Sequence, residues 1–249
     1  MARAALRGRL TWQLGTVEDV VAETDMTASI VLRVPEWPGQ RAGQHVDVRL
    51  TAEDGYQAQR SYSIASAPDE DAVVLTVERL EDGEVSSYLV GELRVGDELE
   101  LRGPIGGYFV WEEAMGGPLM LIAGGSGIVP LRAMLRHRLA RKSAVPVRLL
   151  YSARSHHELI YREELSGLGV EAGVDVSVTL TREQPPGWQG YDRRIDRALI
   201  AEVTWPATER PLAYICGPTS FVEAASDAMV SLGHEPRRIR TERFGPTGR

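Results

Sequence analysis

The feature that most constrains the fold is a change in hydrophobic rhythm near residue 116. Before it, short segments alternate apolar and polar residues and are divided by turn residues, a pattern typical of antiparallel strands. After it, short apolar runs alternate with helical patterns, which predicts βαβ units and a parallel sheet covered on both faces. A chain of 249 residues is long enough for two domains with separate cores. We therefore expect a first domain at 1–115 and a second at 116–249.

Six short strands are expected in the first domain, and this number and spacing favour a closed antiparallel barrel. The expected strands are 15–21, 29–34, 45–50, 60–66, 73–80 and 98–102, with a short helix at 85–93. In the second domain we expect strands at 119–123, 145–151, 174–180 and 212–215, and helices at 129–139, 159–168, 196–203 and 221–232. Ser220, with Glu223 three residues later, is expected to form a capping box that starts the last helix.

Composition and charge argue against several classes of protein. A net charge of -7 disfavours non-specific binding to nucleic acid. Cys216 is the single cysteine, so the chain has no internal disulfide and cannot hold an iron-sulfur cluster with four thiolates of its own. The five histidines show no metal-ligand spacing, and we expect no metal. No apolar run reads as a secretory signal or a membrane span, so a cytoplasmic location is expected.

The first candidate site is Arg60-Ser61-Tyr62-Ser63, within an expected strand. Because side chains alternate along a strand, these four residues can present a charge, a flat ring and small donors to one ligand. Such a ligand would be flat and phosphorylated, and the Arg60 guanidinium would pair with its phosphates. The alternative is an edge strand with a surface arginine and a half-buried tyrosine.

A second candidate contains Gly83, Val85 and Ser86, at the start of the expected short helix. A turn and free backbone N–H groups at a helix start bind anions. An ordinary turn with a serine N-cap would use the same residues. The glycines and proline of 103–109 similarly predict a tight turn between the domains.

In the second domain Gly125, Ser126 and Gly127 directly follow an apolar strand and open a helix with Pro130 in its first turn. Glycines allow a ligand to approach the backbone, and the helix N-terminus attracts its phosphates. The run 216–218 ends the fourth apolar strand, at the edge where open α/β sheets bind ligands. A buried structural role for Cys216 is compatible with that position.

These motifs, in this order, resemble the ferredoxin-NADP reductase superfamily over residues 12–244. The resemblance implies a two-domain flavoprotein, with an N-terminal antiparallel β-barrel that binds FAD and a C-terminal α/β parallel-sheet domain that binds NAD(P)H. Loop 103–109 would close the barrel under the flavin. The FAD-binding residues it implies are Arg60, Ser61, Tyr62, Ser63, Val77, Gly83, Val85 and Ser86. The nucleotide-binding residues it implies are Gly125, Ser126, Gly127, Cys216, Gly217 and Pro218.

The resemblance also implies which residues surround the reacting rings. Tyr62 would stack on the isoalloxazine, and Ser63, Cys216 and Glu242 would act beside the flavin and the nicotinamide. Phe244 stands where plant-type members end in tyrosine, and further residues follow it. Phe244 would either shield the flavin face, or it would not do so and the residues after it would cover the adenine side of FAD.

The choice between NADPH and NADH is expected to depend on residues after the second parallel strand. Ser152, Arg154 and Arg162 suit a 2'-phosphate, whereas an acidic residue there would select NADH. We therefore expect the nucleotide to be NADP(H), with NAD(H) as the alternative. Arg162 on a solvated helix face is an equally good interpretation.

The expected function is hydride transfer from NADPH to FAD, followed by single-electron transfer to a separate ferredoxin or other acceptor protein. A flavin or haem-protein reductase, or a non-enzymatic electron-transfer or nucleotide-sensing subunit, are the alternatives. A basic docking surface for an acidic acceptor could come from two arginine sets, the second of which could equally be exposed helix charge. The sets are Arg3, Arg7 and Arg9, and Arg132, Arg136, Arg138 and Arg141.

Overall fold

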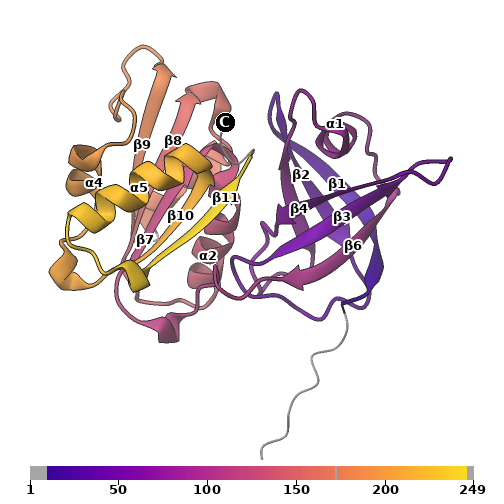
Figure 1. Ribbon diagram of the computed structural model, residues 1–249, viewed down its shortest axis with the longest axis horizontal. Coiled ribbons are helices and arrows are strands. Elements are labelled where there is room, and N and C mark those ends of the chain that lie inside the picture. The colour runs from indigo at the N-terminus through magenta and orange to yellow at the C-terminus, as the bar shows by residue number, and fades with distance from the viewer. Residues whose placement is uncertain (1–9, 172, 246–249) are drawn as a thin grey trace, which may run out of the picture.

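The computed structural model of the chain describes residues 10–171 and 173–245. Its elements form two sheets, each with its own helices, that lie beside each other (Figure 1). The first sheet has six antiparallel strands in the order β4-β3-β6-β1-β2-β5. They are β1 (Trp12–Thr24), β2 (Thr27–Arg33), β3 (His45–Thr51), β4 (Gln57–Ser63), β5 (Val73–Glu78) and β6 (Glu98–Ile105).

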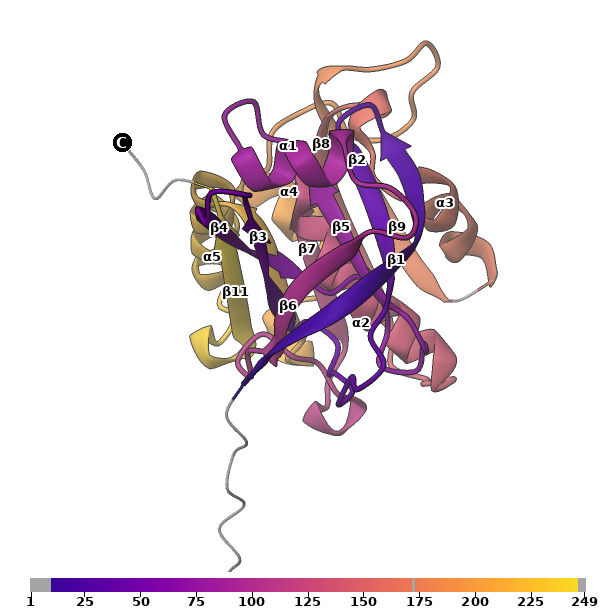
Figure 2. The same ribbon diagram turned by 90° about the vertical axis from the view of Figure 1, so that its right-hand side faces the viewer.

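The first sheet closes into a barrel where β4 meets β5. Ile64, directly after β4, forms an antiparallel bridge with Leu75 of β5. Residues that alternate inward along the strands fill the barrel core. Helix α1 (Glu84–Gly91) covers one end of the barrel (Figure 2) and adds Val85 and Leu89 to that core. The predicted antiparallel barrel is therefore confirmed.

The second sheet has five parallel strands in the order β11-β10-β7-β8-β9. The strands are β7 (Leu119–Gly124), β8 (Val147–Ser155), β9 (Val174–Glu183), β10 (Leu212–Pro218) and β11 (Ile239–Phe244). The helices are α2 (Ile128–Ala140), α3 (Arg162–Glu171), α4 (Arg197–Val203) and α5 (Thr219–Ser231). Short 3-10 helices are η1 (Glu113–Met115), η2 (Gly125–Gly127), η3 (His156–Glu158), η4 (Ala207–Glu209) and η5 (Pro236–Arg238).

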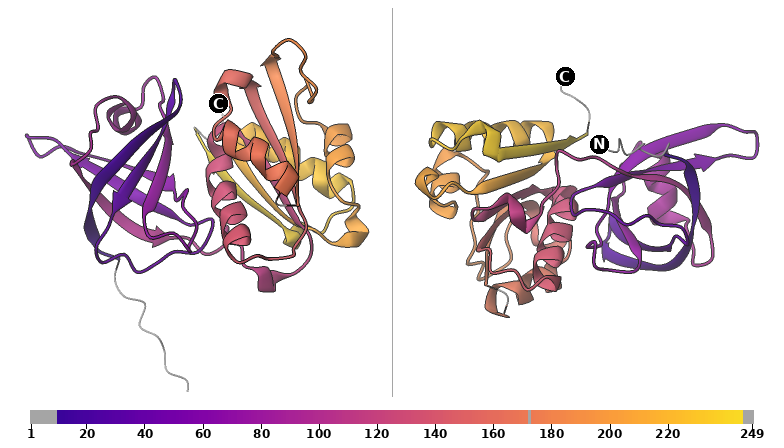
Figure 3. Two further views of the ribbon diagram at one scale, coloured as in Figure 1. Left: turned by 180° about the vertical axis from the view of Figure 1, so that it is seen from behind. Right: turned by 90° about the horizontal axis from the view of Figure 1, so that it is seen from below.

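The two faces of this sheet are covered by different helices, as seen in Figures 1 and 3. Leu119 and Leu121 of β7 pack in the cluster that contains α2 and α3. Met120 and Ile122 of the same strand pack in the cluster that contains α4 and α5. A strand buried on both faces has no polar positions, which explains its continuous apolar run. The predicted α/β domain with a parallel sheet is confirmed.

Several predicted boundaries are wrong for identifiable reasons. Strand β4 begins at Gln57 and ends at Ser63, rather than covering 60–66, because the chain leaves β3 at Ile64 to meet β5. Helix α3 begins at Arg162, three residues later than expected, because Leu159 is extended and Tyr161 has a φ of +59°, neither of which is a helical conformation. Strand β11 was not predicted, because only its two end residues, Ile239 and Phe244, are apolar and the strand lies at a half-exposed sheet edge.

The capping box at Ser220 is also wrong. Helix α5 begins at Thr219, its N-cap position is Pro218, and no side-chain hydrogen bond caps it. Ser220 therefore lies inside the first turn. The domain boundary near 116 falls between the end of β6 and the start of β7, and its exact place stays a prediction. None of the helices in the described part of the chain is long and apolar enough to cross a membrane.

Candidate active site

The three residues predicted to act beside the reacting rings meet at the junction of the two domains. Ser63 ends β4 and is the register partner of His45, which begins β3. Paired residues on antiparallel strands point to the same face. The Nδ1 atom of His45 lies 3.9 Å from Oε1 of Glu242 on β11, the strand beside the barrel in Figure 1. Glu242 is in turn the register partner of Cys216 on β10.

The structure thus connects Ser63, Cys216 and Glu242 through His45, a residue that the sequence analysis missed. In the sequence, His45 is recognisable only as the first residue of an expected strand, and that position does not indicate a functional role. Only the approach of β11 to the barrel, which involves a strand that was not predicted, brings the imidazole to the carboxyl group.

Burial controls the protonation of this group of residues. The side chain of Glu242 is 27% exposed, and its Oε2 atom is buried with no hydrogen-bond partner among the described residues. Burial raises the pKa of Glu242 to about 7. A carboxyl that titrates near neutral pH and keeps one oxygen free can take up or release a proton.

Cys216 is a protonated thiol at neutral pH. Burial and, second, the charge of Glu242 raise the pKa of Cys216. A buried thiol of this kind is a poor nucleophile. The position therefore suits a small neutral neighbour of a nicotinamide ring, and it does not suit covalent catalysis.

In the barrel, Arg60 and Tyr62 share one face of β4, and Ser61 and Ser63 share the other. Tyr62 packs half-buried against the barrel core, and burial raises the pKa of Tyr62 to about 12. The Arg60 side chain is exposed and donates from Nη1 to the carbonyl oxygen of Gln59 at 2.7 Å. A half-buried ring beside an exposed guanidinium fits a ligand that is flat at one end and phosphorylated further along.

Ser61 differs from the other three residues of its motif, because its hydroxyl is already engaged. It donates to Oδ1 of Asp47 at 2.6 Å, and Arg102 donates to Oδ2 of the same carboxylate at 2.6 Å. Asp47 is buried, so this network ties β4 to β3 and β6. A cofactor contact by Ser61 stays a prediction, and its side chain has a structural partner already.

The turn before α1 supports its shape with side chains and offers backbone groups to a ligand. The Ser86 hydroxyl accepts from the Leu80 N–H at 3.1 Å and donates to the Gly83 carbonyl at 3.2 Å. A Cβ at Gly83 would collide with Ser86 Oγ, so the turn requires glycine. Val77 and Val85 are buried in the barrel core. What this turn presents to a phosphate is therefore the N-terminal N–H groups of α1.

In the second domain the predicted glycine loop packs directly against the carboxyl end of β10. A Cβ at Gly127 would collide with the carbonyl oxygen of Cys216, and one at Gly124 would lie 2.9 Å from the ring of Phe221. Gly125 has a φ of +55°, a conformation that glycine adopts without strain. Gly217 also packs closely against Phe221, a residue that the sequence analysis missed.

This contact places the glycine loop, including Ser126, beside residues 216–218 at the end of β10. Both lie at the carboxyl edge of the sheet, where open α/β folds bind ligands. Pro218 is the register partner of Phe244 at the end of β11. Phe244 is partly buried and packs against the second-domain core. The remaining tail lies outside the described residues.

The three residues predicted to select the nucleotide are only partly brought together. Ser152 is buried in β8, whereas Arg154 is exposed on the same strand. Arg162 lies on α3 and lines a groove of about 420 Å³ that also contains His156 and Trp188. Neither Ser152 nor Arg154 lines that groove.

A further cation at this edge was missed. The register of β8 with β9 shifts between Ala153 and Ser155, so Arg154 lies opposite Thr181 and Arg182. Arg182 is exposed. The carboxyl ends of β8 and β9 thus carry Arg154 and Arg182 close together, although they lie 28 positions apart in the sequence.

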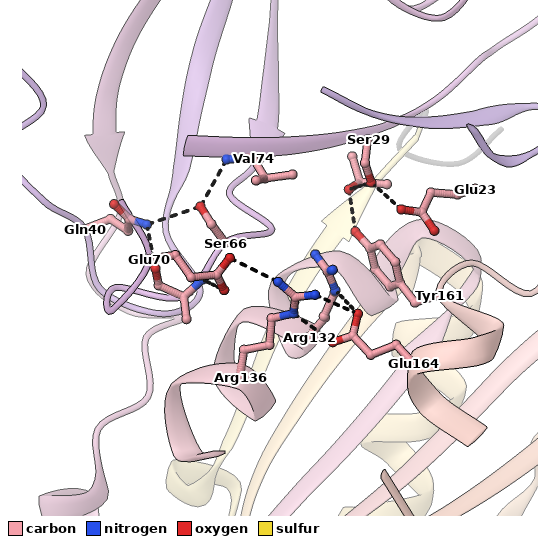
Figure 4. A network of polar contacts seen from close by, with 12 residues as sticks. Glu23, Ser29, Gln40, Ser66, Glu70, Val74, Arg132, Arg136, Tyr161 and Glu164 are labelled. Atoms are coloured by element: carbon pink, nitrogen blue, oxygen red, sulfur yellow. Dashed lines mark hydrogen bonds and ion pairs between the residues drawn. The ribbon is translucent and has the colours of Figure 1, made fainter. Parts of the chain in front are cut away.

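Two of the arginines considered as a docking surface, Arg132 and Arg136 of α2, belong instead to the interface between the domains (Figure 4). Glu164 of α3 accepts from Arg132 Nε at 2.7 Å and from Arg136 Nε at 2.8 Å. Arg136 also donates to Glu70 of the first domain at 3.0 Å. Tyr161, which lies under the Arg132 guanidinium, donates a hydrogen bond to Thr76 of β5.

Both predicted roles, a docking surface and exposed helix charge, are therefore wrong for Arg132, Arg136 and Arg138. Arg132 and Arg138 are buried, and Arg138 donates to the Val145 carbonyl oxygen at 2.9 Å. Arg136 is engaged by two carboxylates of different domains. The other set, Arg3, Arg7 and Arg9, lies outside the described residues. In the described part of the chain, no group of His, Cys, Asp and Glu side chains could hold a metal ion.

Comparison with known proteins identifies both domains. Residues 16–110 match the oxidoreductase FAD-binding domain family, and residues 121–227 match the oxidoreductase NAD-binding domain family. The reductase subunit of an aromatic O-demethylase from an Amycolatopsis species is 32% identical over 248 residues, which is 96% of this chain and 72% of that protein. The ferredoxin reductase component of a 3-ketosteroid-9-alpha-monooxygenase from Mycobacterium tuberculosis is 30% identical over 239 residues, 92% of this chain and 64% of that protein.

The fold comparison agrees. The flavohem-like FAD/NAD-binding domain of nitric oxide dioxygenase from Vibrio cholerae superimposes with a TM-score of 0.85 at 26% identity, covering 96% of this chain and all of that domain. The chain belongs to the ferredoxin-NADP reductase superfamily. It is an oxidoreductase with an FAD-binding barrel and a nicotinamide-nucleotide-binding α/β domain, so the non-enzymatic alternative is set aside. The chain spans only 64% of the length of the mycobacterial relative.

Proposed function

We propose that the chain transfers a hydride from NADPH to FAD and then passes single electrons to a separate ferredoxin-type protein. The observation that carries this proposal is the junction of Ser63 and His45 of the FAD-binding domain with Cys216 and Glu242 of the nucleotide-binding domain. Two redox rings held by these domains would meet there. A four-thiolate cluster that accepts the electrons has to lie outside these 249 residues, because they contain one cysteine.

Each group of residues has a separate task in this proposal. Arg60 and the N-terminal N–H groups of α1 bind the pyrophosphate of FAD, and Tyr62 orients its ring. The glycine loop 125–127 and residues 216–218 at the end of β10 hold the nucleotide against the same junction. When bound, FAD supplies the conversion of a two-electron donor into two one-electron steps. The protein contributes position and exclusion of water.

The residue pattern at the carboxyl edge of the second sheet supports NADPH. Arg154 and Arg182 are exposed side by side at the ends of β8 and β9, and Arg162 lines the adjacent groove. A 2'-phosphate would find charge-assisted hydrogen bonds here. Changing each arginine to alanine should raise the KM for NADPH and leave that for NADH unchanged. Arg197→Ala, an exposed change on α4, is the control. Equal effects on the two nucleotides would contradict a 2'-phosphate contact.

The FAD site is tested by Arg60→Ala, with Arg33→Ala on β2 as a control for loss of an exposed arginine. A charge-assisted hydrogen bond contributes about 1.5–3 kcal/mol, so we expect FAD affinity to fall by about tenfold to a hundredfold in the first variant only. Retention of full flavin after extensive dialysis would remove the pyrophosphate role of Arg60.

The acceptor has one alternative that a specific observation favours. The Vibrio cholerae neighbour belongs by its name to a nitric oxide dioxygenase, which suggests a haem protein instead of a ferredoxin. Purified ferredoxins, cytochromes and free flavins should be compared at equal concentration as acceptors for the NADPH-reduced protein. A ferredoxin should be reduced fastest, and faster reduction of haem protein or free flavin would contradict the proposed acceptor.

A further inference from the structure

Tyr161 lies where the nucleotide-binding domain meets the wall of the FAD-binding barrel. It directly precedes Arg162, which is proposed to bind the nucleotide, and its side chain is only 4% exposed. In Figure 4 this side chain extends from the second domain toward Ser29 of the barrel. The cofactor-binding motifs assign no role to this buried tyrosine.

The backbone of Tyr161 has a conformation that bulky residues rarely adopt. Its φ is +59°, in the left-handed region, and a residue of this kind persists only where its surroundings hold it. Its carbonyl oxygen accepts from the Leu165 N–H at 2.9 Å. Just before it, the Ile160 N–H donates to the Tyr151 hydroxyl at 3.2 Å. The second domain therefore fixes the backbone on both sides of Tyr161, and the side chain is held in the interface.

A chain of hydroxyl groups connects Tyr161 to three strands of the barrel. The Ser29 hydroxyl of β2 donates to Glu23 Oε1 of β1 at 2.6 Å. Because its proton is used there, Ser29 accepts from the Thr76 hydroxyl of β5, with 2.8 Å between the two oxygens. The Thr76 oxygen in turn accepts from the Tyr161 hydroxyl. Each group has a fixed role, and hydrogen bonds in such a chain reinforce one another.

The chain of hydroxyl groups is buried and clamped from the side. Thr76 and Ser29 are each 5% exposed. Burial raises the pKa of Tyr161, so its phenol keeps its proton and remains a donor. The guanidinium of Arg132 on α2 lies over the Tyr161 ring, 4.1 Å from its centre. The ring is therefore held on one face by the helix that follows the glycine loop 125–127.

Tyr161 thus joins elements that belong to the two predicted cofactor sites. On the second-domain side, it precedes Arg162, and its ring contacts the helix that the glycine loop opens. On the barrel side, Thr76 directly precedes Val77, a predicted residue of the FAD site. The glycine loop itself, η2, lies next to β5. A shift at this contact would therefore move the bound nucleotide relative to the flavin.

Building on the proposed function, we infer that Tyr161 is a positioning residue for hydride transfer. Its hydroxyl fixes β5 of the FAD site against the segment that binds the nucleotide, and the two rings are thereby held at reacting distance. The ion pair between Arg136 and Glu70, at 3.0 Å, still joins the domains without this hydroxyl. Loss of the hydroxyl should misplace the rings and leave the domains together. A misplacement of about 1 Å can slow a reaction on the order of a hundredfold.

The first test measures reduction of the flavin by rapid mixing with saturating NADPH. Tyr161→Phe keeps the ring under Arg132 and removes only the hydroxyl, and Tyr88→Phe on α1, half-buried against the barrel core, is the matched control. Both variants should bind FAD and NADP⁺ within about twofold of wild type. Tyr161→Phe should reduce its flavin about tenfold more slowly or worse, and Tyr88→Phe within about twofold of wild type. A wild-type rate in Tyr161→Phe would overturn the positioning role.

The second test needs no reduction. Saturating NADP⁺ should perturb the flavin absorbance spectrum of wild type, because the nicotinamide lies beside the flavin, and Tyr161→Phe should lose at least about half of that amplitude at an unchanged Kd. Thr76→Val removes the acceptor and should act in the same way. The double variant should be no worse than either single variant, since both act through one hydrogen bond. Additive effects, or full spectral amplitude in Tyr161→Phe, would overturn the positioning role. Failure of NADPH to reduce the wild-type protein would instead overturn the proposed function.

Discussion

Glu164 is predicted to hold the two domains in the orientation that the site requires. Its carboxylate accepts from Arg132 and Arg136, and Arg136 extends the network to Glu70 of the barrel (Figure 4). Glu164→Gln keeps the shape of the side chain and removes its charge. Arg132, whose side chain is 9% exposed, would then face the Arg136 cation without a counter-charge.

The size of the effect follows from the burial of the partners. Removal of one partner from a fully buried ion pair costs about 3–5 kcal/mol. Here the side chains of Glu164 and Arg136 are 26% and 33% exposed, and water screens part of the interaction. We expect Glu164→Gln to lower the free energy of unfolding by about 2–3 kcal/mol. Glu163→Gln, at the exposed neighbouring position, should change it by less than about 0.5 kcal/mol.

The assay is denaturant unfolding of both variants and wild type, followed separately by flavin release and by circular dichroism, because a two-domain protein need not unfold in one step. Burial acts to raise the pKa of Glu164, but hydrogen bonds and charges from Arg136 and Arg132 outweigh it and hold the pKa below its ordinary value. The deficit of the variant should therefore be full at pH 7 and shrink as the pH falls below about 4.5. Equal stability of the Glu164 and Glu163 variants at pH 7 would refute the reasoning.

Two further changes test the site itself. Burial raises the pKa of Glu242 from 4.5 to about 7. Its ionisation should therefore lower the free energy of unfolding by about 3 kcal/mol between pH 4.5 and pH 8. Glu242→Gln should lack this loss and be more stable than wild type above pH 7, and the same pH dependence of unfolding in both proteins would contradict the burial argument. Gly127→Ala should weaken nucleotide binding and destabilise the fold by about 1–3 kcal/mol, because its Cβ would meet the Cys216 carbonyl. Gly167→Ala, on α3 with nothing within 4 Å of the added Cβ, should be neutral or stabilising, and similar behaviour of the two variants would refute the packing argument.

The fold could be predicted from the sequence wherever burial leaves a regular pattern. Strand β7 is buried on both faces and reads as an unbroken apolar run. Strand β11 lies at a half-exposed sheet edge, and its sequence IRTERF has no such run, so it was missed. The Ser220 capping box failed because the pattern of two residues does not show where the preceding proline places the helix start.

The site was predictable where one segment carries its chemistry, and it was not where distant segments meet. The residues 60–63 and 125–127 could each be proposed as a ligand site from local spacing, and that role stays a prediction. His45 depends on the approach of β11 to the barrel, and Arg182 on a register shift between β8 and β9. The sequence likewise presents Arg132 as a helix surface residue, because its partner Glu164 lies 32 positions away. Contacts of this kind follow from tertiary packing.

The most direct test of the central claim is an anaerobic titration of the FAD-loaded protein with NADPH and, separately, with NADH, followed by visible absorbance. We predict that the flavin band bleaches with one equivalent of NADPH and that NADH requires a much higher concentration. A protein that binds no FAD, or an FAD-loaded protein whose flavin band does not bleach with NADPH, would contradict the proposed hydride transfer.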